Sequence, residues 1–226
     1  LKEFGLKFYL PGVILQYPSN EDPSQIRPFQ DNPKLFTIFR QAEKWSTAMG
    51  IRNVADLNKC IEEGRAPDLI RISEAQQEKQ IGAIADSIAE QKDTIRMILI
   101  AGPSSSGKTT FAQRLRVQLM VNGLHPVPIS MDNYYLDRNQ VMLDENGEQD
   151  LESIEAIDVP LFNEQMTSLI QGQEVEIPQY SFLTGKREEV GHRIQLSSEQ
   201  PIIVEGIHGL NEKLTEMIPA ENKYKI

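Results

Sequence analysis

A run of small and polar residues between positions 102 and 110 has the residue types and spacing of a phosphate-binding loop. It matches the pattern of glycine, any four residues, glycine, lysine, and serine or threonine. Glycine allows backbone angles that a side chain would forbid, so such a loop can wrap an anion and point several N–H groups at it. Lys108 could reach the outer phosphates of a nucleotide, and the Thr109 hydroxyl suits a Mg²⁺ ion. We therefore predict a nucleotide site formed by Gly102, Pro103, Ser104, Ser105, Ser106, Gly107, Lys108, Thr109 and Thr110.

Two carboxylates follow other apolar segments of the chain. Asp132 comes directly after residues 126–131, and Glu205 ends the apolar stretch 201–205. Asp132 could accept the proton of an alcohol that attacks a phosphate, and Glu205 could bind Mg²⁺ through water. Both residues have a structural alternative, because aspartate and glutamate also cap turns and helices.

Four aromatic residues could complete a site for a flat ring joined to a sugar: Tyr134, Tyr135, Tyr180 and Phe182. Each of them could equally anchor the core or a loop. His208 follows Glu205 closely, and we expect it to be structural rather than catalytic.

The elements around these residues predict how they meet. An apolar strand, 97–101, precedes the phosphate-binding loop, and an amphipathic helix, 111–121, follows it. Residues 126–131 and 201–205 read as further buried strands, and Asp158 is suited to cap a helix over 159–170. Short strands are expected at 175–177 and 193–196, and the last residues look like the start of another strand. Strands alternating with helices predict an α/β fold, with a parallel sheet covered by helices on both faces, so the polar strand ends share one edge.

The first 92 residues read as a separate, mainly helical part without a defensible site. Two short apolar stretches, 6–10 and 13–17, could be strands, and helices are expected at 33–50 and 54–62. Ser73 and Gln76 resemble a capping box that opens a helix reaching about residue 91. Trp45 is expected to anchor a core. We therefore predict an N-terminal part over 1–92 and a nucleotide-binding domain over 93–226.

The composition restricts the partners. The 226 residues carry a net charge of −10, which argues against nucleic acid or an anionic membrane as a partner of this stretch. Cys60 is the single cysteine, so no intramolecular disulfide can form, and we expect a reducing, cytoplasmic location with Cys60 as a small apolar residue on a helix. No apolar run has the length of a membrane span. Because the chain starts at Leu1 and stops as a strand begins, we expect both ends to be cuts through a longer protein.

Five motifs, in order, resemble those of the uridine kinase and phosphoribulokinase family. They are Ala101-Gly-Pro-Ser-Ser-Ser-Gly-Lys-Thr-Thr110, Ile129-Ser-Met-Asp-Asn-Tyr-Tyr135, Asp150-Leu-Glu-Ser-Ile-Glu-Ala-Ile-Asp158, Ile177-Pro-Gln-Tyr-Ser-Phe182 and Val204-Glu-Gly-Ile-His-Gly-Leu210. The resemblance covers roughly residues 95–218. It implies a P-loop fold of the nucleoside-monophosphate-kinase type, and ATP- and Mg²⁺-dependent phosphorylation of the 5′-hydroxyl of a pyrimidine nucleoside.

The resemblance also implies roles for single residues. The general base falls on Asp132, the nucleoside-contacting tyrosine on Tyr135, the ribose-holding acid on Glu152, the base-stacking aromatics on Tyr180 and Phe182, and the second acidic motif on Glu205. Two positions depart from the family. A pyrimidine-reading histidine would fall near Gly185 and is absent, and Glu152 stands where those nucleoside kinases carry aspartate. The lid arginines would lie beyond Ile226. Residues before 92 resemble the N-terminal extension of a bacterial subgroup, which is similar to the N-terminal domains of threonyl-tRNA synthetase.

These observations favour an ATP-dependent kinase of a nucleoside or a related sugar-containing acceptor. A sugar-phosphate kinase of the phosphoribulokinase type is one alternative. Another is a regulatory switch, in which bound ATP changes how the N-terminal part meets a partner. Asp132 with its tyrosines favours a kinase, because a switch needs no group that activates an alcohol. The sequence leaves the acceptor, the activity of this stretch by itself and the formation of homo-oligomers open.

Overall fold

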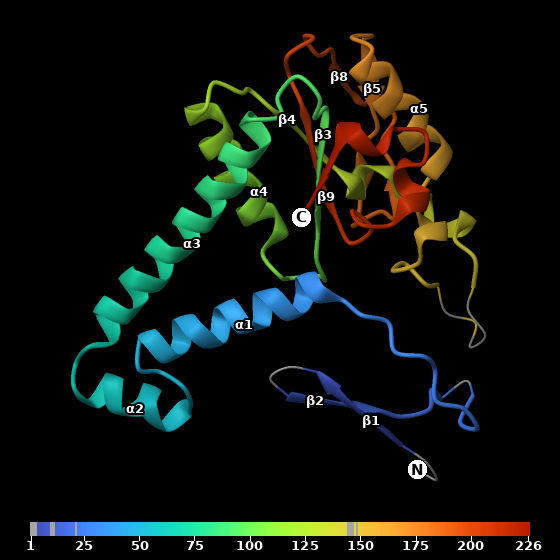
Figure 1. Cartoon of the computed structure of the whole chain (residues 1–226). Helices are drawn as coiled ribbons and strands as arrows, with labels where there is room; N and C mark the ends of the chain where they lie inside the picture. The colour runs from blue at the N-terminus through green and yellow to red at the C-terminus, as the bar shows by residue number, and fades with distance from the viewer. Residues whose placement is uncertain (1–3, 10–11, 21, 144–146, 148) are drawn as a thin grey trace. The chain divides into compact units, whose positions relative to one another are not determined.

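The computed structural model describes residues 4–9, 12–20, 22–143, 147 and 149–226 (Figure 1). By its internal contacts the chain divides into two compact units, Leu1–Ile72 and Ser73–Ile226. This division falls earlier in the chain than the boundary after residue 92 that the sequence suggests. The assignment of two domains stays a prediction.

The N-terminal unit begins with a hairpin. Strands β1 (Gly5–Tyr9) and β2 (Gly12–Gln16) pair in antiparallel fashion, so the two predicted strands are each other's partners. Helices α1 (Pro33–Ala48) and α2 (Val54–Glu62) follow at the predicted positions. Asn32 and Asn53 cap them, because each side chain accepts a hydrogen bond from a backbone N–H three residues later. Cys60 is buried on α2, as predicted, whereas Trp45 is only partly buried.

Helix α3 (Ala66–Ala89) corrects the predicted capping box. The pattern at Ser73 predicts a helix start there, but Ser73 lies inside α3, which begins a full turn and more before it. Pro67 and Asp68 occupy the first turn, where the fixed backbone angle of proline and the charge of aspartate both suit a helix N-terminus. Nothing between Asp68 and Ser73 interrupts a helix, so the earlier start is the stable one.

The C-terminal unit contains a parallel sheet with the strand order β10-β3-β9-β4. The strands are β3 (Met97–Ala101), β4 (Val127–Ser130), β9 (Ile202–Gly206) and β10 (Lys223–Lys225). The carboxyl ends of β3, β9 and β4 are aligned, because Ala101 pairs with Gly206 and Ser130 pairs with Glu205. Within the described residues β4 is an edge strand, as Pro128 indicates, because proline has no N–H for a neighbouring strand.

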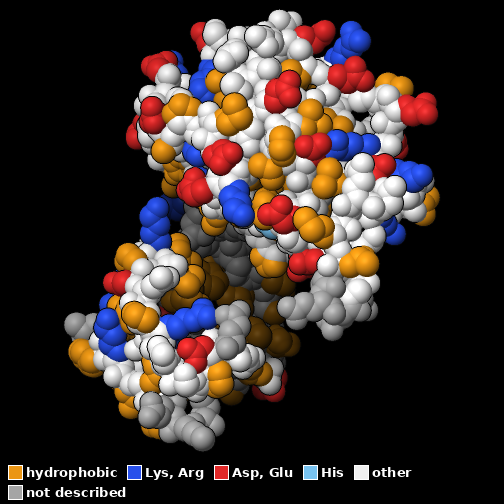
Figure 2. Space-filling view, turned by 90° about the vertical axis from the view of Figure 1, so that its right-hand side faces the viewer, with side chains coloured by type: hydrophobic (Ala, Val, Ile, Leu, Met, Phe, Trp, Pro, Cys, Tyr) orange, Lys and Arg blue, Asp and Glu red, His pale blue; other side chains and the backbone are white. Residues whose placement is uncertain are grey.

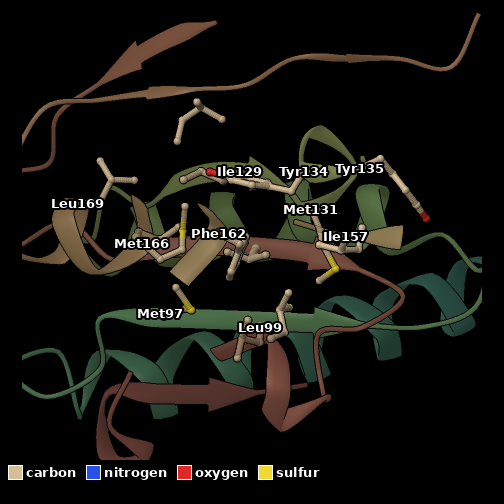
Figure 3. Packing of buried hydrophobic residues seen from close by; sticks show 14 of the residues in the cluster. Met97, Leu99, Ile129, Met131, Tyr134, Tyr135, Ile157, Phe162, Met166 and Leu169 are labelled. Atoms are coloured by element: carbon tan, nitrogen blue, oxygen red, sulfur yellow. The ribbon is translucent and has the colours of Figure 1, made fainter. Parts of the chain in front are cut away.

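Helices cover both faces of this sheet (Figure 1). Met97 and Leu99 of β3 belong to a core cluster with α5 (Val159–Ile170), while Ile98 and Ile100 belong to one with α3 and α4 (Lys108–Val121). Successive residues of a strand point to opposite faces, so one short strand serves both cores. Figure 3 shows part of the first cluster, with side chains from β3 and α5 directed toward each other. The predicted α/β fold is confirmed.

Apart from α5, the remaining elements of the C-terminal unit are short. Asp158 caps α5 as predicted, accepting a hydrogen bond from the N–H of Leu161 at 3.1 Å. Two antiparallel pairs follow, β5 (Val175–Ile177) with β8 (His192–Ile194), and β6 (Tyr180–Ser181) with β7 (Lys186–Arg187). Short 3₁₀ helices complete the unit, at Met131–Tyr134, Arg138–Gln140, Ile154–Ala156, Glu212–Thr215 and Ala220–Asn222.

The surface of the C-terminal unit has no single dominant character on the face seen in Figure 2. Acidic and basic side chains are interspersed there with apolar ones. Among the described residues, we find no helix with the length and apolar character that crossing a bilayer requires.

Candidate active site

The phosphate-binding loop joins β3 to α4 and has the backbone shape that its glycines allow. Gly107 caps α4 with φ of +88°, and Ser105 also has a positive φ of +57°. A Cβ atom at Gly102 would lie 2.8 Å from the hydroxyl oxygen of Ser106, so a larger residue would not fit there. The first N–H groups of α4 have no partner within their helix, and the positive end of the helix dipole lies at the same place. The loop is therefore suited to hold phosphate, which is the predicted function of this stretch.

Thr109 brings this loop to the end of β9. Its hydroxyl oxygen lies 3.2 Å from a carboxylate oxygen of Glu205. The pair fits Mg²⁺, because both are oxygen ligands and this ion keeps several waters when it binds phosphates. Among the described residues no group of three or more histidine, cysteine or acidic side chains could hold a metal. An ion at this place would therefore depend on nucleotide and water for its other ligands.

Asp132 lies in the 3₁₀ helix directly after β4. The backbone N–H of Asp132 donates a hydrogen bond to the hydroxyl oxygen of Ser130 at 3.3 Å, which fixes the turn. Although much of the residue is exposed, partial burial of the carboxyl group raises its pKa, and the charge of Glu205 raises it further. The charge of Lys108 acts in the opposite direction. The parallel pairing of β3 and β4 with β9 brings the three strand ends together, as the sequence predicts.

One cavity of about 490 Å³ joins the predicted residues. Residues of the phosphate-binding loop form one wall, and acidic and aromatic residues form the other. Its lining consists of Ser104, Ser105, Gly107, Lys108, Thr109, Thr110, Asp132, Tyr135, Leu151, Glu152, Phe182, Glu205 and Ile207. The candidate site residues that do not line it are Gly102, Pro103, Ser106, Tyr134 and Tyr180.

The aromatic wall of this cavity is a cluster of three rings that meet edge-on or tilted rather than stacked. Tyr135 and Tyr180 are buried, whereas Phe182 is half exposed. The ring centre of Tyr135 lies 5.5 Å from that of Tyr180 and 5.6 Å from that of Phe182, so Tyr180 supports the wall without reaching the cavity. Burial, followed by the charges of Asp132 and Glu152, raises the pKa of Tyr135 to about 12. Its hydroxyl is therefore protonated at neutral pH and can donate a hydrogen bond.

Tyr134 takes one of the two roles that the sequence leaves open for it, that of a core anchor. The sequence groups it with the aromatic residues of the site, but it is fully buried and packs edge-on against Phe162 at 4.9 Å. Its hydroxyl donates to the side-chain oxygen of Gln165 at 2.8 Å. Figure 3 shows the rings of Tyr134 and Tyr135 pointing in opposite directions, the first into the core. Adjacent residues of a tight turn face different sides, which the sequence pattern does not resolve.

A second cavity, of about 440 Å³, lies on the other side of the phosphate-binding loop. It shares Gly107, Lys108 and Thr110 with the first and extends along α4 to Phe111 and Arg114. The sequence analysis did not single out these last two residues. Lys108 itself donates a hydrogen bond to the carbonyl oxygen of Pro103 at 2.8 Å. The loop thus separates two spaces that could each hold one partner of a transfer reaction.

Comparison with known proteins decides the family. The model of the phosphoribulokinase / uridine kinase family matches residues 97–218, which is more than half of the chain. The chain belongs to this family. Within the family's model lie all the predicted site residues, from Gly102 to Glu205.

Individual relatives are similar over the same region. A uridine kinase of Schizosaccharomyces pombe is 38% identical over 127 residues, which are 55% of this chain and 27% of that protein. The inorganic pyrophosphatase TTM2 of Arabidopsis thaliana is 33% identical over 133 residues, 58% of this chain and 18% of that protein. The chain thus spans about a quarter or less of the length of these relatives. A solved structure described as a possible uridine kinase from Bacillus stearothermophilus is 22% identical, with a TM-score of 0.46, covering 55% of this chain and 67% of that one.

One position that departs from the family pattern has a local physical reason. Gly185 is buried and has φ of +67°, a conformation that side chains disfavour. A Cβ atom there would lie 2.5 Å from the Cδ atom of Arg138, so Arg138 occupies the space of any side chain at residue 185. A histidine could not be placed at this position without moving Arg138. Arg138 was not predicted, and neither was Arg187, which contacts the turn after Asp132, because a lone arginine near a turn has no distinctive spacing.

Proposed function

We propose that this protein is an ATP-dependent kinase that phosphorylates a hydroxyl group of a nucleoside, uridine- or cytidine-like, or of a related small sugar-containing acceptor. The observation that carries the proposal is the cavity in which Lys108, Asp132 and Glu152 line one space beside the phosphate-binding loop. A protein that only held or hydrolysed a nucleotide would need no acidic pocket with an aromatic wall beside the place of the terminal phosphate. Membership of the family supports the same reaction class.

Asp132 is the proposed general base. The acceptor hydroxyl would donate a hydrogen bond to its carboxylate and lose its proton there, as its oxygen forms a bond to the terminal phosphorus and the bond to the leaving ADP oxygen breaks. The raised pKa of Asp132 makes it a stronger base than an ordinary aspartate. Asp132 follows the end of β4 and lines the same cavity as the phosphate-binding loop, at the shared edge of the sheet.

The loop residues would bind and orient the phosphates. Lys108 would neutralise charge on the outer phosphates after its hydrogen bond to Pro103 is exchanged for one to the nucleotide. Thr109 and Glu205 would hold Mg²⁺, which when bound neutralises the negative charge of the phosphates. The second cavity, along Phe111 and Arg114, has a suitable place for the nucleoside part of ATP.

The charge of the first cavity favours an uncharged acceptor. Among its described lining residues Lys108 is the single cation, against three carboxylates, Asp132, Glu152 and Glu205. A sugar phosphate would bring further negative charge close to these groups, which costs free energy unless cations balance it. A polyol instead offers hydroxyl donors to carboxylates, and a flat ring could lie on Tyr135 and Phe182. A phosphoribulokinase-like activity on a sugar phosphate is therefore less favoured than phosphorylation of an uncharged acceptor.

A regulatory switch remains a second candidate, and the specific observation that favours it is Gly185. The space of a base-reading side chain is taken by Arg138, so the acceptor pocket is altered at that point. In this case ATP would bind, and the acceptor reaction would be slow or absent.

The experiment that tests the proposal measures acceptor-dependent transfer from ATP labelled at the terminal phosphate. The acceptors are uridine, cytidine, purine nucleosides, free ribose and ribulose 5-phosphate, each with Mg²⁺. Transfer to a nucleoside supports the kinase, transfer to the sugar phosphate supports the alternative, and label released only to water supports the switch. We also propose a cytoplasmic location, since the single cysteine, Cys60, is free and buried, and a kinase domain over residues 93–226 with an appended N-terminal part.

A further inference from the structure

Two rings of the aromatic wall, those of Tyr180 and Phe182, belong to a small hairpin, and Arg187 lies on its second strand. Strands β6 and β7 pair Tyr180 directly with Arg187, and Phe182 follows β6. Two residues per strand supply few hydrogen bonds, so such a hairpin is not stable by itself. Its position relative to Asp132 must therefore be set by contacts outside the hairpin.

The Arg187 side chain makes three of those contacts with three different nitrogen atoms. Its Nε donates to the carbonyl oxygen of Tyr135 at 3.0 Å, and its Nη2 donates to the carbonyl oxygen of Tyr134 at 3.0 Å. Its Nη1 donates to a carboxylate oxygen of Asp158 at 3.0 Å. The two carbonyls end the 3₁₀ helix that contains Asp132, where carbonyl groups lack partners within the helix.

Asp158 extends this set of contacts to α5. One carboxylate oxygen pairs with Arg187 while the other caps the helix at Leu161, and its own N–H donates to the carbonyl of Tyr134 at 2.8 Å. The backbone N–H of Arg187 donates to the side chain of Asp137 at 2.9 Å. Arginine alone suits this place, because a planar guanidinium offers several N–H groups in a fixed fork, whereas lysine is a single point of charge.

We propose that Arg187 is a positioning residue for the acceptor: it fixes the separation between the β6–β7 hairpin, which carries Tyr180 and Phe182, and the turn that carries Asp132 and Tyr135. This inference rests on the proposed kinase function. Arg187 does not line the cavity, so it acts through the residues that do. Its loss should misplace the acceptor and leave the phosphate-binding loop intact, because none of its described contacts reaches residues 102–110.

The test compares Arg187→Ala and Arg187→Lys with Lys186→Ala, which removes a charge from the exposed neighbour on the same strand. We expect Arg187→Ala to raise KM for the acceptor at least about tenfold, because small misplacements of reacting groups cost up to about a hundredfold in rate. KM for ATP should stay within about twofold of the wild-type value. Arg187→Lys, which keeps a charge opposite Asp158, should have an acceptor KM between those of the wild type and Arg187→Ala. Lys186→Ala should keep the wild-type KM, and millimolar guanidinium should partly restore Arg187→Ala while leaving Lys186→Ala unchanged.

Folded protein is counted in each sample by its stoichiometry of ATP binding, and if Arg187→Ala does not fold, Arg187→Lys carries the test. An unchanged acceptor KM in the folded variants, or equal losses for ATP and acceptor, would overturn the proposal. Hydrogen exchange gives a readout without catalysis: exchange at residues 134–137 and 180–187 should accelerate in both variants, and exchange at 97–110 should not. If the wild-type protein transfers phosphate to no acceptor, the kinase function fails, and unchanged exchange would separately reject the role of Arg187.

Discussion

Replacing Asp132 by asparagine tests the proposed base most directly. The substitution keeps the size of the side chain and its hydrogen-bonded turn at Ser130, while the carboxylate is lost. A positioned general base contributes about a hundredfold to ten-thousandfold to a rate, which corresponds to about 2.7–5.4 kcal/mol of activation free energy. We therefore expect kcat with the best acceptor to fall by about a hundredfold or more. ATP affinity should change little, since the loop, Lys108 and Thr109 are untouched.

The dependence of the rate on pH has a defined direction. Burial and the charge of Glu205 raise the pKa of Asp132, so the base is protonated, and activity lost, at a higher pH than for an ordinary aspartate. The acidic limb of kcat/KM should therefore lie above the usual range of aspartate and disappear in Asp132→Asn. In Glu205→Gln the remaining activity should have its acidic limb at lower pH, because one of the charges that raise the pKa is removed.

Stability should change in the opposite sense to activity. A carboxyl group whose pKa is higher in the folded than in the unfolded state binds its proton more tightly when folded, so its ionisation at neutral pH costs folding free energy. Asp132→Asn removes this cost and should raise the melting temperature at pH 7. The gain should shrink as the pH falls through the raised pKa, and vanish below the ordinary pKa of aspartate, where the wild-type carboxyl group is protonated in both states.

The assay is steady-state transfer from labelled ATP, together with thermal unfolding from pH 3 to 8. The matched control is Asp93→Asn, an exposed aspartate before the first residue of β3 and therefore at the opposite edge of the sheet. It should leave the rate unchanged. Full activity of Asp132→Asn, or an acidic limb that persists in it, would refute the assignment of the base.

Three further changes test the rest of the site and the core. Lys108→Ala should weaken ATP binding by about tenfold to a hundredfold, as the loss of a charged hydrogen bond implies, and unchanged affinity by calorimetry would contradict the role of the loop. Glu205→Gln should raise the Mg²⁺ concentration for half-maximal rate by about tenfold or more, because it removes a charge beside Thr109; an unaltered Mg²⁺ titration would exclude it from the metal site. Tyr134→Phe should lower the free energy of unfolding by about 1 kcal/mol, since Gln165 loses its donor, and should leave KM for the acceptor at the wild-type value; a raised acceptor KM would place Tyr134 in the site after all.

Local patterns predicted the parts of the fold that are governed by local physics. The apolar strand before Gly102 and the helix after Gly107 follow from residue types within a dozen positions, and the cap at Asp158 follows from one side chain. The parallel sheet followed from apolar strands that alternate with helices, and the shared site followed from the polar group at the end of each strand, since the carboxyl ends of parallel strands lie at one edge. These inferences needed no knowledge of distant contacts.

Sequence patterns gave a wrong or incomplete answer where several local signals competed or where the contact was distant. At Ser73 a capping pattern occurs inside a longer run of helix-forming residues, and Pro67 determines the start instead. The direction of the Tyr134 side chain depends on the core cluster with Phe162, which is assembled from separate elements. Arg187 reaches carbonyls more than fifty positions earlier in the chain, and no spacing in the sequence encodes such a contact.

Pro128 has a consequence for how copies of this protein behave at high concentration. An outer strand with a full row of free N–H and carbonyl groups can recruit a strand from another molecule, which begins aggregation. Because β4 is the outer strand beside β9 and proline supplies no N–H, that row is broken at its second residue. Intermolecular growth of the sheet from this side is thereby hindered while the chain folds and after it has folded.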